Sequence, residues 1–131
     1  MGQEGRIFVT YIKKQRRMET KKKYYMECHL AGRKYYDADE VWDKLRVGTV
    51  VELERDLENK FDGNAVAVMY SDEETEGPVC LGYIPREDND TIAAFMDMGW
   101  GDIFECRISR VNAEAYSEQQ IYLTIKIKRR Q

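Results

Sequence analysis

The sequence is poor in the residues that build metal sites, disulfide scaffolds and redox centres. Among its 131 residues there is one histidine, His29, and there are three cysteines at wide spacings without a CxxC pair. A two-histidine metal site is therefore impossible, and zinc binding, disulfide scaffolding and a redox motif are poorly supported. Cys28, Cys80 and Cys106 each fall in an apolar, strand-like run, where a free cysteine behaves as a small buried apolar residue. We expect no metal site and no cofactor.

Long apolar runs are also missing. No stretch approaches the roughly 18 residues of a membrane span, and the start of the chain, MGQEGRIFVT, lacks the charged and apolar regions of a signal peptide. With 2 prolines, 43% hydrophobic and 34% charged residues, the composition is typical of a globular protein and not of a disordered chain. We predict a single cytoplasmic domain over residues 1–131 without membrane contact.

Acidic residues are scarce at both ends of the chain. Residues 1–36 carry ten Lys and Arg against three Asp and Glu, and residues 119–131 carry four against none. Residues 37–118 are the reverse, with seven basic and twenty-one acidic side chains, so that the net charge is -3. If the fold brings the two ends together, they form a basic surface that attracts phosphate groups.

Apolar alternation and turn residues divide the chain into short elements. Strands are expected at residues 6–12, 24–32, 49–56, 64–70, 79–85, 102–111 and 119–129. A short helix is expected from about Ala38 to Arg46, started by Asp37, and a second one after Asp88 or Asp90, stopped by Gly99. The basic run at residues 13–23 indicates a solvated hairpin or loop, with phosphate binding as the alternative. These elements favour an all-β barrel or a small α+β domain.

Catalytic signatures are absent as well. The sequence has no nucleophile elbow, no P-loop, no dinucleotide-binding glycine motif and no EF-hand loop. Cys28 and His29 are neighbours on a strand, so their side chains point to opposite faces and cannot form a dyad. Carboxylates are clustered, but most clusters fall on helix caps, one face of a strand or polar loops, which leaves a metal-dependent nuclease as a remote alternative.

The segment NKFDGNAVAV, residues 59–68, concentrates turn-forming residues directly before a strand. One interpretation is purely structural: Asp62 bonds the backbone N–H groups of its own turn, and Phe61 anchors the turn in the core. The other interpretation is a turn that shapes a binding pocket.

Three stretches resemble one known family. The stretch LAGRKYYDADEVWDKLRVGTVVELERDLENKFDGNAVAV, followed by LGYIPRE and TIAAFMD, resembles the HIRAN domain, which occurs at the N-terminus of certain SWI/SNF-type translocases and as a free-standing bacterial protein. The resemblance runs from about Leu30 to Arg110, and the joint pattern is much more specific than any of its parts. It implies a mainly β fold, a small OB-like β-barrel with two short helices.

The resemblance also implies a site. Members of the eukaryotic translocase type recognise the 3'-hydroxyl end of single-stranded DNA, holding terminal bases against aromatic side chains. We expect stacking by the tyrosines and by Phe61, which stands where DNA-binding relatives carry tyrosine, and acceptance of the terminal hydroxyl by Asp62. Arg33, Lys34 and Arg86 are expected to contact phosphates. The candidate residues are Arg33, Lys34, Tyr35, Tyr36, Phe61, Asp62, Asn64, Tyr83 and Arg86.

The leading hypothesis is a non-enzymatic module that binds free 3' ends of single-stranded DNA in repair or replication. Its partners would be DNA ends and a helicase, translocase or nuclease. The main alternative is a protein–protein interaction module of a DNA-processing complex that uses the same surface, because a barrel does not dictate its ligand.

Overall fold

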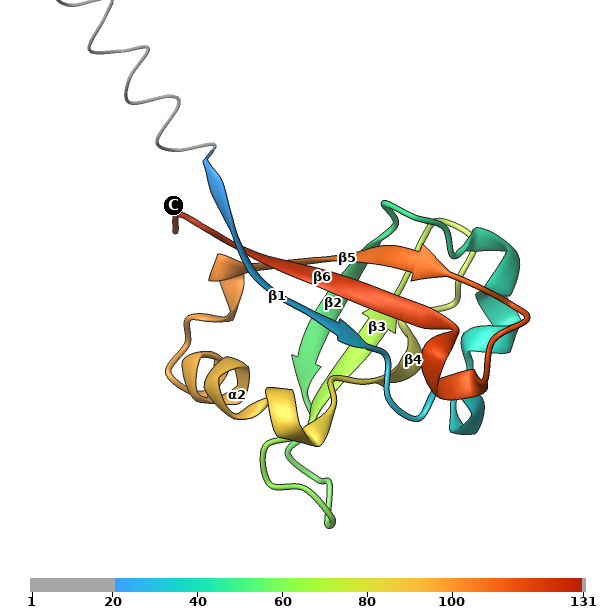
Figure 1. Ribbon diagram of the computed structural model, residues 1–131. Helices are drawn as coiled ribbons and strands as arrows, with labels where there is room; N and C mark the ends of the chain where they lie inside the picture. Colours follow the sequence, from blue (N-terminus) through green and yellow to red (C-terminus); the bar gives the residue numbers. More distant parts are fainter. Residues whose placement is uncertain (1–20, 131) are drawn as a thin grey trace, which may run out of the picture.

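A computed structural model describes residues 21–130 of the chain. They form one six-stranded sheet in which all paired strands are antiparallel and the spatial order is β1-β6-β5-β2-β3-β4 (Figure 1). The strands are β1 (Lys22–His29), β2 (Val50–Arg55), β3 (Val66–Tyr70), β4 (Val79–Tyr83), β5 (Phe104–Val111) and β6 (Ile121–Lys128). Every expected strand within the described range is present. The strand expected at residues 6–12 and most of the basic run at residues 13–23 lie outside that range.

The alternation of β6 sets its two faces. Ile121, Leu123 and Ile125 are fully buried, whereas Lys126 and Lys128 beyond them are exposed. A strand with period-two patterning must turn one face to the core, and this one lies in the middle of the β1-β6-β5 half of the sheet. Its polar face is therefore the outer face of that half, as the sequence predicts.

The two edge strands meet at one point. Ala31, just after β1, exchanges two backbone hydrogen bonds of 2.9 Å with Tyr83 at the end of β4. The contact needs a glycine, because Gly82 has φ +153° and an added Cβ would lie 2.5 Å from the carbonyl oxygen of Ala31. The curled sheet is OB-like and mainly β, as predicted, but this isolated bridge does not close it into a continuous barrel.

The helical segments are short. Within residues 21–130 there is one α-helix, α2 (Asp90–Asp97), and it is accompanied there by the 3-10 turns η1 (Arg33–Tyr35), η2 (Ala38–Lys44), η3 (Arg86–Asp88), η4 (Gly101–Ile103) and η5 (Ser117–Gln119). The first expected helix is therefore a 3-10 segment, kinked at Val41, and Asp37 makes no capping bond there. Asn89, and not Asp88 or Asp90, is the N-cap residue of α2.

The core lies between the curled sheet, α2 and η2. Its largest fully buried side chains include Leu30, Leu81, Ile84, Ile92, Ile108, Ile121, Leu123 and Ile125. Cys28 and Cys106 are buried among them, which confirms for these two the prediction of small buried apolar residues, and burial raises the pKa of the Cys28 thiol to about 12. Cys80 is only half-buried. Within residues 21–130, no helix has the length and apolar character to cross a membrane.

Candidate nucleic-acid interface

Six of the nine residues expected to form a site line one hollow of about 350 Å³. We call it the aromatic hollow; its walls are Ala31, Gly32, Tyr35, Tyr36, Asn59, Phe61, Asp62, Ala65, Tyr83, Ile84 and Arg86. The segment after β1, the loop between β2 and β3, and the end of β4 supply these residues. The bridge between Ala31 and Tyr83 brings the first and last of these segments together.

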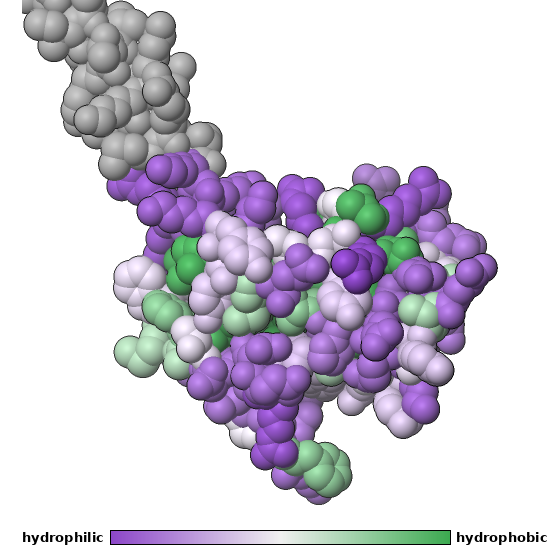
Figure 2. All heavy atoms as spheres, viewed as in Figure 1, coloured by the Kyte–Doolittle hydropathy of each residue, from purple (hydrophilic) through white to green (hydrophobic). Residues whose placement is uncertain are grey.

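The aromatic side chains of the hollow are accessible from solvent. Tyr35 is 73% exposed and Phe61 is 88% exposed, while the rings of Tyr36 and Tyr83 pack against each other with centroids 5.1 Å apart. The loop that carries Phe61 protrudes below the sheet in Figure 1, and an apolar side chain stands out at its tip in Figure 2. The interpretation in which Phe61 anchors the turn in the core is therefore wrong. Exposed rings on a braced scaffold offer faces on which bases stack.

The loop between β2 and β3 is held in shape by backbone hydrogen bonds donated to its own asparagine, Asn59. The Oδ1 atom of Asn59 accepts the backbone N–H groups of Phe61 and Asp62 at 2.9 and 3.0 Å. Asn59 itself donates to Asp56 at 3.4 Å, and Asp56 accepts the Tyr83 hydroxyl at 2.6 Å. That hydroxyl lowers the pKa of the Asp56 carboxyl, and burial together with Asp56 raises the pKa of Tyr83. The loop and the end of β4 thus form one unit.

Asp62 takes part in two contacts that fix its orientation. Its Oδ1 atom accepts the N–H of Asn64 at 2.9 Å, which is the turn-bonding role that the structural interpretation gave it. Its Oδ2 atom accepts the side-chain amide of Asn89 at 2.8 Å, and Asn89 is 1% exposed. A carboxylate has about four lone-pair sites, so Asp62 keeps acceptor capacity for a ligand hydroxyl. The structural and the binding roles are compatible.

Arg55 braces the same loop from β2. Its guanidinium donates to the carbonyl oxygens of Ala65 at 2.6 Å and Gly63 at 2.9 Å, and it forms a forked ion pair with Asp97 at the end of α2. The side chain of Arg55 is only 11% exposed, and it lowers the pKa of Asp97. The hollow-forming loop is therefore fastened to both ends of α2, by Asn89 and by Arg55.

Three of the expected residues do not line the hollow. Arg33 is buried: its guanidinium lies 4.5 Å from the ring centre of Trp42 and donates to Asp39 at 2.6 Å. Contrary to expectation, Arg33 is thus not an exposed phosphate contact. Its guanidinium is already engaged by the ring of Trp42 and the carboxylate of Asp39, both in η2. The ammonium of Lys34 lies 5.1 Å from the ring centre of Tyr35, at the edge of the hollow. Asn64 is exposed and contributes its backbone N–H to Asp62.

Sequence reasoning missed four residues that shape the site: Arg55, Asp56, Asn59 and Asn89. Asn59 is the first residue of the NKFDGNAVAV segment, and its side chain accepts hydrogen bonds from the backbone N–H groups two and three residues later. An asparagine in this position of a turn is a recognisable local signal. Each of the other three makes a contact across 27 or more residues of sequence, Arg55 with Asp97, Asp56 with Tyr83 and Asn89 with Asp62, and no local pattern marks these contacts.

The remaining candidates for chemistry do not converge. Nε2 of His29 lies 3.5 Å from Oε2 of Glu118, and the other carboxylate oxygen of Glu118, Oε1, accepts the N–H of Gly32. Between residues 21 and 130, no three His, Cys, Asp or Glu side chains are grouped so that they could hold a metal ion. The nuclease alternative has no candidate centre in that range.

The family model of the HIRAN domain matches residues 23–127. The chain belongs to the HIRAN family. HIRAN domains are in general DNA-binding modules. The match covers all six strands except Lys22 at the start of β1 and Lys128 at the end of β6, and it includes every residue of the aromatic hollow.

Two solved structures have the same fold. A protein from Lactobacillus plantarum is 25% identical, with a TM-score of 0.63 over 82% of this chain and 95% of that one. The HIRAN domain of human HLTF is 18% identical, with a TM-score of 0.51 over 82% of this chain and 80% of that one. No curated protein sequence matches the chain significantly. The fold of this HIRAN domain is therefore shared with a human relative of low identity.

Proposed function

We propose that this HIRAN domain is a non-enzymatic module that binds single-stranded DNA at a free 3'-hydroxyl end. The observation that carries the proposal is the meeting of Tyr35 with Phe61 and Asp62 around one hollow, although Tyr35 comes from a different segment of the chain. Exposed rings stack on bases of any sequence, at about 1–3 kcal/mol per base. This suits a ligand that is defined by its end and not by its sequence.

Asp62 supplies the end preference in this proposal. A carboxylate accepts a hydrogen bond from a terminal hydroxyl and repels a terminal phosphate. Arg86, exposed at the rim of the hollow, and Lys34, beside Tyr35, are the cations placed for the phosphates that precede the end. By family resemblance, the context is DNA repair or replication, next to a helicase, translocase or nuclease that acts on the same end.

The test is fluorescence anisotropy with a short single strand labelled at its 5' end. Oligonucleotides ending in a 3'-hydroxyl and in a 3'-phosphate are compared at two salt concentrations. We expect tighter binding of the hydroxyl form, and a steep loss of affinity with salt for both. Equal affinity for the two ends would refute end recognition, and no binding at low salt would favour a protein ligand for the hollow.

A matched pair of variants tests the stacking role. Phe61→Ala should weaken binding about 5- to 100-fold, corresponding to the loss of one stacked base. Leu57→Ala is the control, because Leu57 is on the same loop, is also exposed and does not line the hollow. If the two variants bind equally, Phe61 is not a stacking residue.

A further inference from the structure

A second surface of the protein gathers cations at the start of β1 and the end of β6. These two strands are antiparallel neighbours, with Lys22 opposite Lys128 and Tyr24 opposite Lys126 (Figure 1). On the next strand, Glu105 lies opposite Lys126, and Arg107 follows two residues later on the same side. We call this surface the basic sheet face; it consists of Lys22, Tyr24, Glu105, Arg107, Lys126 and Lys128. Of the first basic end, Lys22 thus lies beside Lys126 and Lys128 of the last basic end.

The charges of the basic sheet face are only partly balanced. Glu105 pairs with Arg107 and Lys22, and these two cations lower its pKa to about 2. Within the described part of the chain, Lys126 and Lys128 make no ion pair, and both are exposed. Four cations thus face one carboxylate. Like charges directly opposite each other destabilise a sheet, and an anion placed between the strands relieves that repulsion.

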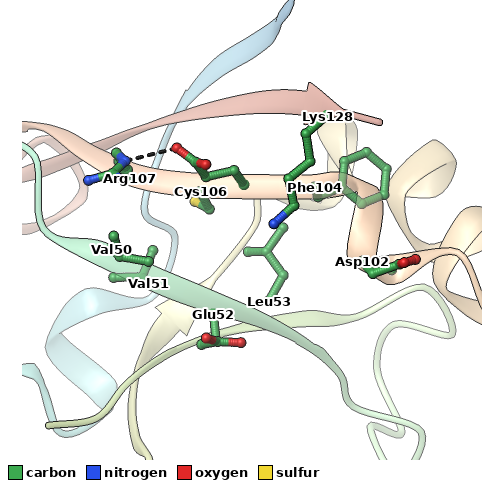
Figure 3. A pocket seen from close by; sticks show the side chains of 11 residues that line it. Val50, Val51, Glu52, Leu53, Asp102, Phe104, Cys106, Arg107 and Lys128 are labelled. Carbon is green, nitrogen blue, oxygen red and sulfur yellow. Dashed lines mark hydrogen bonds and ion pairs between the residues drawn. The ribbon is translucent and has the colours of Figure 1, made fainter. Parts of the chain in front are cut away.

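A hollow of about 270 Å³ borders this face, where β2 and β5 separate. The two strands pair only at Val50 and Val51, and β2 then continues its pairing with β3 alone. Figure 3 shows the side chain of Lys128 reaching across Phe104 toward Leu53, with its ammonium group directed into the opening. Glu52 and Asp102 line the opposite side of this hollow. Because these two carboxylates repel phosphate groups, we expect a bound strand to follow the lysines of β6 and not the acidic side of the hollow.

Tyr24 gives the face an aromatic component. It is 66% exposed and is the cross-strand partner of Lys126. An accessible ring among unpaired lysines combines a stacking surface with phosphate-binding charges, which is the combination found in grooves for single-stranded nucleic acids. An acidic peptide needs the charges but has no bases to stack on the ring.

We propose that the basic sheet face binds the strand of nucleic acid that continues from the end held in the aromatic hollow. This inference rests on the proposed function and adds a second contact to it. β1 runs from Lys22 to His29, and Ala31 lines the hollow, so the two sites are separated by about 30 Å of extended strand. At about 3.4 Å per stacked nucleotide, roughly nine nucleotides cover that distance. A tetranucleotide reaches only one site, whereas a 16-mer reaches both.

The experiment measures the affinity of single-stranded DNA of four and of sixteen nucleotides, both with a 3'-hydroxyl, for the full chain. Lys126→Glu is compared with Arg46→Glu, which makes the same charge change at an exposed position after η2, outside both sites. We expect Lys126→Glu to weaken 16-mer binding about 10-fold, to lower the salt slope by about 0.7 for each phosphate that the variant no longer binds, and to leave the tetranucleotide unaffected. Tyr24→Ala should weaken only the 16-mer, and Tyr24→Phe should restore it.

The outcomes separate this inference from the proposed function. If the 16-mer binds no tighter than the tetranucleotide, or if Lys126→Glu and Arg46→Glu weaken it equally, the second contact is refuted. A preserved preference for the 3'-hydroxyl in that case leaves end binding intact. If the end preference is missing but the effect of Lys126→Glu is specific to the 16-mer, only end binding is refuted.

Discussion

Replacing Arg55 by alanine tests whether the loop of the aromatic hollow is held from outside. Arg55 donates to the carbonyl oxygens of Ala65 and Gly63 and forms an ion pair with Asp97. Each charge-assisted bond to a carbonyl contributes about 1.5 kcal/mol at the lower end of the usual range, so the two together contribute about 3 kcal/mol. The exposed ion pair with Asp97 is left out of this figure, because solvent screens it. The expected loss of stability is therefore about 3 kcal/mol.

For a chain of this length, about 3 kcal/mol corresponds to a decrease in Tm of roughly 10 °C. Thermal unfolding followed by circular dichroism measures the decrease, and Arg46→Ala is the control for loss of an exposed arginine. Arg55→Lys should be intermediate, because an ammonium cannot reproduce the fork to two carbonyls and a carboxylate. Below the melting range, limited proteolysis should cut Arg55→Ala within residues 56–65 faster than the unchanged protein.

The same variant should lose affinity for DNA ends, because Phe61 and Asp62 lie on the released loop. A decrease in Tm within about 1 °C of that of Arg46→Ala would contradict the bracing role. So would a normal rate of cleavage in the loop. Loss of stability with unchanged end affinity would mean that the loop keeps its binding shape without Arg55.

Four single substitutions give further predictions. Asp62→Ala should abolish the preference for a 3'-hydroxyl in the anisotropy assay and lower stability by about 1–3 kcal/mol, because the buried amide of Asn89 loses its acceptor; Asn89→Ala should affect stability while keeping part of the preference. The Tyr83 hydroxyl lowers the pKa of Asp56 in the folded protein. Their hydrogen bond therefore stabilises the fold above about pH 4, and this stabilisation disappears as the pH falls through the lowered pKa of Asp56. Tyr83→Phe should therefore unfold more easily in urea at pH 7, with a smaller difference from the unchanged protein at pH 2. Gly82→Ala should destabilise the fold strongly in the same assay, because its Cβ would meet a carbonyl oxygen at 2.5 Å.

The strands of this protein could be predicted because each carries its own pattern. The alternation at Ile121–Lys128 gives both the strand and its buried face without knowledge of any partner. The helix expected from Ala38 was harder, because its short apolar stripe fits a 3-10 segment as well as an α-helix, and the kink at Val41 depends on packing. The position of Arg33 could not be predicted, since the ring of Trp42 and the carboxylate of Asp39 that hold it become neighbours only in the folded chain.

For the site too, the sequence indicates which residues take part but not the contacts between distant residues that hold them. The family pattern indicates which side chains meet, and the hollow contains most of them. It does not indicate how they are held, because Arg55 and Asp97 are 42 residues apart in sequence. Contacts of that kind depend on how the loop, β4 and α2 pack, and a local motif carries no information about them.

The way in which the hollow is held bears on how well it can discriminate between ends. Its loop is fixed to β4 through Asp56, and to the two ends of α2 through Asn89 and Arg55. The carboxylate of Asp62 is thereby held before any ligand arrives, and only exposed rings such as Phe61 need to be ordered on binding. A group that is already oriented loses little entropy when it bonds a hydroxyl, and it cannot turn away from a phosphate. A site of this kind separates the two ends by repulsion as well as by attraction, so the discrimination should weaken in Arg55→Ala more than the affinity itself.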